Sequence, residues 1–362
     1  MGPGAPGRPG ILDRVKVGAA RAAAANWVAR HAAGAAWFRG AFFSGSTVGL
    51  PDGAELALGS DVDVMVVTAR EEPPPKPGKL LHRGALLEVT SLPWRLLASA
   101  EQVLASYHLA GSFRVDTLVA DPTGHLRRLQ QRVARGFAEP AWVRRRCEDA
   151  RRRVSDRLRA LDPSAPFHDQ VTAWLFPTGV TTHVVLVAAL RNPTVRLRYL
   201  AAREALADHG HAELYPELLA LLGCAGWTRS RAERHLRQLA RAFDAAAAVA
   251  ATPFFFSGDV TELARPVAID ASRRLIDGGR HREAVFWMVA TSARCQKILA
   301  ADAPPRVRRE HAPAFEAMVA DLGITSTADL GRRADEVIGF LPRLWRTAEA
   351  IMPAGRDAAP RS

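Results

Sequence analysis

Hydrophobic positions follow two different patterns along the chain. In roughly the first third, short runs of β-branched and aromatic residues alternate with polar loops, which is the pattern of strands. Apolar residues at helical spacing and a polar, proline-rich stretch separate these runs. The predicted strands are Trp37–Ser44, Asp61–Thr68, Ala85–Leu92 and Val115–Ala120, the predicted helices are Ile11–Ala36 and Trp94–Ala105, and the predicted surface loop is Ala69–Lys79.

From about Leu126 to Met352 the chain shows almost only helical patterns, which proline and glycine interrupt. This change predicts two domains of different class. We therefore expect an α+β fold, with a small mixed-sheet domain over residues 11–138 and an all-helical domain over residues 139–362. Residues 1–10 are rich in glycine and proline and are expected to form a flexible lead.

The composition is that of a globular chain with a large positive net charge. The 362 residues are 48% hydrophobic and 24% charged, which suits a folded core and excludes a disordered chain. The net charge of +12 favours anionic partners such as nucleotides, nucleic acid or anionic lipid. Nearly all the cations are arginine, and alanine, glycine and proline are abundant, which is also typical of a GC-rich genome. The charge therefore does not by itself predict a nucleic-acid surface.

Three features predict a cytoplasmic protein. The three cysteines, Cys147, Cys224 and Cys295, are far apart and form neither a zinc motif nor a disulfide framework. The glycine- and proline-rich start lacks the apolar core of a signal peptide. The stretch Val171–Leu190 lacks acidic and basic residues over a membrane-spanning length, but it contains proline, glycine and histidine. We read it as the buried central helix of a soluble domain, and we expect no membrane partner.

Two aspartates lie inside an apolar strand. Asp61 and Asp63 are two residues apart, so their side chains point to the same side, while Val62, Val64 and Val66 face the opposite way and can be buried. Neighbouring carboxylates repel each other at the edge of a core unless a cation lies between them. Mg²⁺ prefers oxygen ligands and is often bound by one or two carboxylates together with substrate phosphates. This pair is therefore a candidate Mg²⁺ site, and two such ions suit an in-line displacement at phosphorus.

A turn and a third carboxylate extend this candidate site. The turn at Gly45 and Ser46 combines a close backbone approach with a hydroxyl donor, as phosphate-binding turns do. Glu88 lies in the middle of another apolar run and could face the same ions from a neighbouring strand. It would serve as a third metal ligand or as the base that accepts a proton from an attacking hydroxyl.

In this order and context, the residues Gly45-Ser46, then Ser60-Asp61-Val62-Asp63-Val64, then Glu88 resemble the polymerase-beta-type nucleotidyltransferase superfamily. Within that superfamily, the arrangement GS…SDVDVMVVT…LLEVTSLPWR is most similar to bacterial aminoglycoside adenylyltransferases and related small nucleotidyltransferases. The resemblance covers roughly residues 35–130, and the helical part matches only in general architecture.

The resemblance implies a role for each of these residues. Gly45 and Ser46, with Ser60 beside the aspartates, would bind the nucleotide, and Asp61 and Asp63 would bind Mg²⁺, with two ions expected. Glu88 would be the general base or a third metal ligand. Residues 11–138 would then be the nucleotidyltransferase domain, and ATP or another nucleoside triphosphate would be the donor.

The function expected from this resemblance is transfer of AMP from ATP to a hydroxyl of a small, aminoglycoside-like acceptor. Two alternatives remain open: transfer to tRNA or to a protein, and a non-catalytic or antitoxin-like module that binds a protein partner. The sequence predicts neither the acceptor nor the oligomeric state, because a fold and its motif do not determine a substrate.

The helical half contains fewer signals. His183 is expected to be a core residue, and the alternative is that it lines a cleft with the two preceding threonines. Arg196 and Arg203 are expected on a solvated helix face, although one of them could reach a triphosphate. The arginine-rich run Arg144–Arg153 is likewise expected to be a solvated face. Phe254–Phe256 is expected to pack in the core at a helix start rather than to form a stacking surface.

Overall fold

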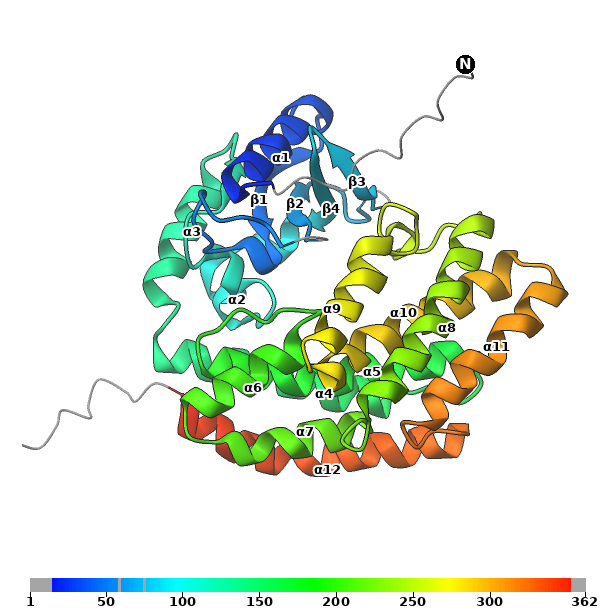
Figure 1. Ribbon diagram of the computed structural model, residues 1–362. Helices are drawn as coiled ribbons and strands as arrows, with labels where there is room; N and C mark the ends of the chain where they lie inside the picture. Colours follow the sequence, from blue (N-terminus) through cyan, green and yellow to red (C-terminus); the bar gives the residue numbers. More distant parts are fainter. Residues whose placement is uncertain (1–14, 58–59, 74–75, 353–362) are drawn as a thin grey trace, which may run out of the picture.

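The computed structural model describes residues 15–57, 60–73 and 76–352. It confirms the predicted α+β class: a mixed sheet with flanking helices comes first, and a helical region follows (Figure 1). The glycine- and proline-rich lead at residues 1–10 lies outside the described residues.

The sheet has the strand order β3-β4-β2-β1-β5. Strands β2 and β4 run parallel, while β1 pairs antiparallel with both β2 and β5, and β3 pairs antiparallel with β4. The strands are β1 (Phe38–Ser44), β2 (Val62–Thr68), β3 (Gly78–His82), β4 (Ala85–Pro93) and β5 (Leu118–Ala120).

Helices cover both faces of this sheet because each face carries apolar side chains. Helix α1 (Val17–His31) packs small residues such as Ala20 and Ala24 against the valines of β2 that alternate with the aspartates. On the other face, Phe42 and Val67 pack with residues of α2 (Ala100–Ala105) and α3 (His125–Gly136). The sheet is thereby held as the middle layer of three.

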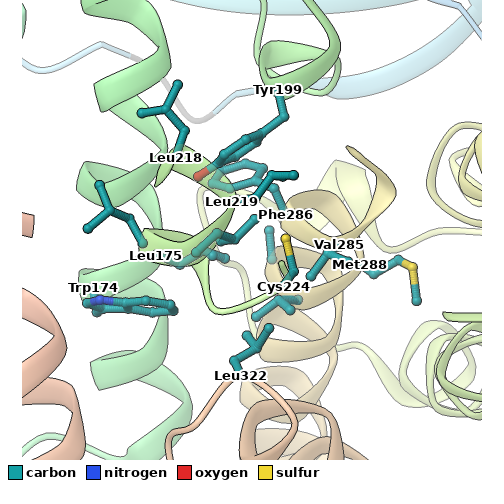
Figure 2. Packing of buried hydrophobic residues seen from close by; sticks show 14 of the residues in the cluster. Trp174, Leu175, Tyr199, Leu218, Leu219, Cys224, Val285, Phe286, Met288 and Leu322 are labelled. Atoms are coloured by element: carbon teal, nitrogen blue, oxygen red, sulfur yellow. The ribbon is translucent and has the colours of Figure 1, made fainter. Parts of the chain in front are cut away.

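The helical region is built around α5, which contributes many of its buried side chains. Figure 2 shows Trp174 and Leu175 of α5 packing near Leu218, Tyr199 and Phe286, which come from other helices. The helices are α4 (Pro140–Arg159), α5 (Phe167–Ala188), α6 (Arg198–Asp208), α7 (Tyr215–Leu222), α8 (Arg229–Val249), α9 (Ala271–Asp277), α10 (His281–Asp302), α11 (Pro305–Ala320) and α12 (Thr327–Ile351).

Helix α5 is long and apolar enough to cross a membrane by length and composition alone. It is the one such helix among the described residues, and 78% of its most apolar window is buried inside the protein. It therefore serves as the centre of the helical core, as the sequence predicts.

Several element boundaries differ from the predictions. The first helix begins at Val17 and ends at His31, and the predicted start at Ile11 lies outside the described residues. The helix predicted over Trp94–Ala105 is split into a short 3₁₀ turn (Trp94–Leu97) and α2, because Ser99 is extended and caps α2 by accepting a hydrogen bond from the backbone N–H of Gln102. Strand β5 covers only the last three residues of the strand predicted there.

The prediction of a surface loop over Ala69–Lys79 is wrong at its end. Strand β3 begins at Gly78, and Lys79 pairs with Glu88 on β4. The strand lies at the edge of the sheet and pairs on one side only, so the prolines that precede it do not prevent its pairing.

The prediction of a solvated face over Arg144–Arg153 is also wrong in part. Arg146 is buried and donates to the carbonyl oxygens of Leu104 and Phe137, at 3.2 and 2.5 Å. Asp149 is buried as well and accepts a hydrogen bond from the backbone N–H of Tyr107. This side of α4 therefore joins the helical region to the sheet domain, while the remaining arginines of the run are more exposed.

Candidate active site

A cleft of about 450 Å³ lies between the sheet and the helical region. Its sheet side carries the acidic strand residues and the Gly45 turn, and its helical side carries residues from the segment before α6 and from α10. The polar lining residues of the sheet side are Gly45, Ser46, Thr47, Glu55, Ser60, Asp61, Asp63, Lys76, Lys79 and Glu88. Every residue that the sequence analysis assigned to catalysis, nucleotide binding or metal binding therefore lines one cleft.

Neighbouring parallel strands bring the three carboxylates together. Asp63 lies in β2 and is the register partner of Glu88 in β4, and Asp61 directly precedes β2. The valines that alternate with the aspartates are fully buried on the opposite face. The strand period thus places all three acids at one edge of the sheet domain, facing the cleft.

The turn after β1 requires glycine at position 45. Gly45 has a φ of +71°, and a Cβ at this position would overlap the Oδ2 atom of Asp63. The turn backbone can therefore approach the aspartate closely only without a side chain. The carbonyl of Gly45 accepts a hydrogen bond of 2.7 Å from Nδ2 of Asn192, which ties the turn to the helical region.

We expect Gly45→Ala to destabilise the protein by roughly 1–3 kcal/mol, because alanine is strained at this φ and displaces the Asp63 carboxylate. Gly53→Ala is the matched control, since a Cβ there meets no atom within 4 Å. Urea unfolding of both variants measures the difference, and equal stability would contradict the requirement for glycine.

Two lysines that the sequence analysis did not single out occupy the acidic end of the cleft. Lys79 of β3 forms ion pairs with Asp61 and Glu88, and its side chain is only 5% exposed. It also lies 3.4 Å from a carboxylate oxygen of Asp259 in the helical region. Lys76 forms a further ion pair with Glu88. The only local signal was the pair Leu80-Leu81 between polar residues, and the prolines before it favour a loop.

Burial and the neighbouring charges shift the pKa values of the three acids in different directions. Burial, together with the negative charges of Asp61 and Glu88, raises the pKa of Asp63 to about 8. Burial also raises the pKa of Asp61, although Lys79 opposes the effect. Burial acts on Glu88 in the same sense, but Lys79 and Lys76 together outweigh it and lower the pKa of Glu88 to about 2. Glu88 is therefore ionised at neutral pH, whereas Asp63 lacks sufficient counter-charge.

The donor set fits Mg²⁺ in its chemistry. Carboxylate oxygens are the ligands that this ion prefers, and the raised pKa of Asp63 marks negative charge that a cation would neutralise. No group of three His, Cys, Asp or Glu side chains in the described part of the chain is arranged to hold a metal as it stands. The amino group of Lys79 lies between Asp61 and Glu88. A Mg²⁺ site here would thus use Asp61 and Asp63 with substrate phosphates, and would include Glu88 only after Lys79 moves.

The helical side of the cleft carries two arginines, one acid and two aromatic residues. Arg294 of α10 donates to Asp259 at 2.9 Å. Arg196 precedes α6 and donates to the carbonyl oxygen of Val267 at 3.3 Å. Phe255, Asp259 and Trp287 complete this wall.

Two expectations for the helical half are therefore wrong. Arg196 is partly buried in the cleft rather than on a solvated helix face, because the chain turns before α6 begins. Phe255 does not pack in the core: it is 77% exposed and lines the cleft, although Phe256 beside it is buried.

Two further residues lie away from the cleft. His183 is buried, and its Nε2 atom is 2.9 Å from the carbonyl oxygen of Thr194, so the core interpretation is confirmed. The two preceding threonines donate to carbonyls of their own helix. Arg203 is half-exposed and pairs with Glu283 at 2.8 Å.

Comparison with known proteins adds no relative. No protein-family model matches the chain. No curated protein matches it at a significant level.

Proposed function

We propose that this protein is a Mg²⁺-dependent nucleotidyltransferase that moves a nucleoside monophosphate, AMP from ATP, to a hydroxyl of a small acceptor. The observation that carries the proposal is the meeting of Asp61, Asp63 and Glu88 with the Gly45 turn in one cleft. A cleft with convergent charged groups and perturbed pKa values is the pattern of an active site. The resemblance of these residues to the polymerase-beta-type motif supports the same reading.

In this proposal, Gly45 and Ser46 bind the phosphates of the donor, since the turn exposes backbone and a hydroxyl to the cleft. Ser60 lies beside Asp61 at the same end and would contact the nucleotide. Asp61 and Asp63 would hold Mg²⁺, which when bound neutralises phosphate charge and orients the donor. The protein's own contribution is position and charge, as is usual for transfer at phosphorus.

The transfer step is an in-line substitution. The acceptor oxygen bonds to the α-phosphorus, the bond from that phosphorus to the oxygen bridging to the β-phosphate breaks, and pyrophosphate leaves with the electron pair. The acceptor hydroxyl loses its proton to a base. Glu88 is a weak base while Lys79 and Lys76 hold its pKa near 2. In this arrangement Glu88 is therefore a poor base, and it would become a metal ligand only after Lys79 moves.

Isothermal titration with a non-hydrolysable ATP analogue tests the proposal. We expect binding in the presence of Mg²⁺ and binding at least roughly tenfold weaker in EDTA or in Asp61→Asn, because losing even an outer partner of a metal ligand costs about tenfold to a hundredfold. Asp335→Asn is the control, since Asp335 is an exposed residue of α12.

Absence of binding to ATP, GTP, CTP and UTP analogues by the folded wild-type protein would refute the proposal. Equal binding with Mg²⁺ and with EDTA would refute the metal assignment alone. If no nucleotide analogue binds and the protein forms a stable complex with another protein chain, the non-catalytic, partner-binding alternative is favoured.

A further inference from the structure

The acceptor must reach the cleft past the helical wall, and this wall is basic. Its charged lining residues are Arg196, Asp259 and Arg294, so cations outnumber acids among the described residues of this side. On the opposite side, Asp61, Asp63 and Glu88 lie at the proposed metal position, and Glu55 is the remaining acid. The charge available to an acceptor therefore depends on which of the three helical groups is already paired.

Asp259 is already paired twice. One of its carboxylate oxygens accepts from Arg294 at 2.9 Å, and the other lies 3.4 Å from Nζ of Lys79. Its side chain is 14% exposed. A cationic acceptor would have to displace a buried arginine or lysine to use this carboxylate, which leaves an uncompensated charge behind.

Arg294 is held in place by more than its ion pair. Its guanidinium lies over the rings of Phe176, Phe256 and Trp287, with distances of 5.6, 5.5 and 5.1 Å to the ring centres. Burial lowers its pKa, and the charge of Asp259, followed by that of Glu88, opposes the change. Arg294 is therefore a fixed cation whose charge Asp259 neutralises.

Arg196 is the cation of this wall that has no carboxylate partner among the described residues. Its hydrogen bond to the carbonyl oxygen of Val267 leaves other guanidinium N–H groups for a ligand. Asp61 across the cleft is near enough to raise its pKa against the larger, lowering effect of burial. A guanidinium in this position suits two-point binding of a carboxylate or phosphate.

An apolar surface lies in the same cleft. Phe255 is 77% exposed and lines the cleft, so its ring is accessible to a ligand that enters there. Trp287 also lines the cleft, and its indole Nε1 is buried without a hydrogen-bond partner within the described residues. These two residues offer apolar contacts in the same cleft as Arg196.

On the basis of the proposed nucleotidyl transfer, we propose that the acceptor is a small anionic hydroxyl compound with an apolar ring. Its carboxylate or phosphate binds Arg196, and its ring contacts Phe255 and Trp287. A polycationic aminoglycoside does not match this wall. The one acid of the wall, Asp259, is already engaged by Arg294 and Lys79. The aminoglycoside-like acceptor expected from the resemblance stays a prediction. The charge of the compound that binds distinguishes that cationic acceptor from the anionic acceptor proposed here.

Three probes of similar size and different charge test the inference: 4-hydroxyphenylacetate, the neutral alcohol tyrosol and the cation tyramine. Each is titrated into protein saturated with Mg²⁺ and the ATP analogue, with ligand-observed NMR as the readout. We expect the anion to bind at least about tenfold more tightly than the cation, which corresponds to about 1.4 kcal/mol. In Arg196→Gln this preference should fall to within about threefold. Arg237→Gln, at an exposed position of α8, should leave it unchanged.

The possible results separate this inference from the proposed function. Equal binding of the three probes, or binding of none, would overturn the inference, as would tighter binding of an aminoglycoside than of the anion. If Arg196→Gln weakens binding of the ATP analogue about tenfold and leaves the charge preference among the probes unchanged, Arg196 binds the nucleotide donor instead of the acceptor. Displacement of the bound anionic probe by an equal concentration of tRNA would favour a nucleic-acid acceptor. Failure of the analogue to bind wild-type protein refutes the nucleotidyltransferase alone, and the charge preference is then read on the free protein.

Discussion

Replacing Asp63 by asparagine is expected to abolish Mg²⁺-dependent nucleotide binding and, at the same time, to stabilise the ligand-free protein. Asparagine keeps the shape of the side chain but removes a charge that burial, Asp61 and Glu88 all disfavour. The loss of affinity should be at least roughly a hundredfold. Mutation of a residue that only orients a metal ligand lowers affinity by up to about a hundredfold, and removal of the ligand itself should cost more. The gain in stability should be about 1 kcal/mol, which is usual for a single stabilising substitution at a site that trades stability for function.

The gain should depend on pH in a definite direction. The pKa of Asp63 rises from 3.8 to about 8 on folding, so the folded protein binds a proton that the unfolded chain releases between these values. This group therefore lowers stability progressively as the pH rises from about 4 to about 8. The advantage of Asp63→Asn over the wild type should accordingly be larger at pH 8 than at pH 5.

Chemical unfolding in EDTA at the two pH values measures this difference, and titration with the ATP analogue measures the affinity. Asp335→Asn again serves as the control and should change neither quantity. An Asp63→Asn variant that is less stable than the wild type would show that Asp63 makes a structural contact instead. A variant that keeps Mg²⁺-dependent binding would remove Asp63 from the metal site.

Replacing Lys79 by methionine is expected to destabilise the metal-free protein by about 3 kcal/mol, because removal of one partner of a buried ion pair leaves the other charges uncompensated. Lys79 is 5% exposed and pairs with Asp61 and Glu88, with Asp259 at 3.4 Å. Methionine keeps most of the length and the apolar character of the lysine side chain, so the lost charge is the main change.

Divalent metal should restore this stability in the variant. In the wild type, the ammonium group already neutralises Asp61 and Glu88, so Mg²⁺ without nucleotide should bind weakly and change the melting temperature little. In Lys79→Met the same carboxylates lack that cation, and a ligand that binds only the folded state raises its stability. We therefore expect Mg²⁺ and Mn²⁺ to raise the melting temperature of the variant more than that of the wild type.

Lys76→Met provides a graded control. Among the described residues, Lys76 pairs with Glu88 alone, and its side chain is 25% exposed. Its replacement should therefore cost less and should create less response to metal. Equal stability of the two lysine variants would contradict the central position of Lys79. An equal response to Mg²⁺ in the wild type and in Lys79→Met would show that the lysine does not compete with metal.

The acidic half of the site could be predicted from local patterns. The alternation around Asp61 and Asp63 places both acids on the side opposite the buried valines, and this holds in the structure. Gly45 could be recognised as a turn residue, and its positive φ confirms that reading. Glu88 was found as a charge inside an apolar run, but its position opposite Asp63 depends on β2 and β4 being neighbours.

Lys79 could not be recognised in the same way. The prolines before it indicate a loop, and its strand forms because β4 offers a free edge for pairing. Arg196 was expected on a helix, but α6 begins two residues after it. The exposure of Phe255 inside a run of three phenylalanines likewise depends on where the neighbouring helices leave a cleft.

By itself, the sequence determined the order of a sheet domain and a helical region, the buried face of β2, and the acids and glycine on the sheet side of the cleft. These features follow from periodicity and from the conformational limits of single residues, which are local properties. Only the tertiary structure decided that Lys79 neutralises those acids and that Arg196, Asp259 and Arg294 face them. These groups are far apart in sequence, and their meeting depends on how the helical region packs against the sheet, which no short pattern encodes.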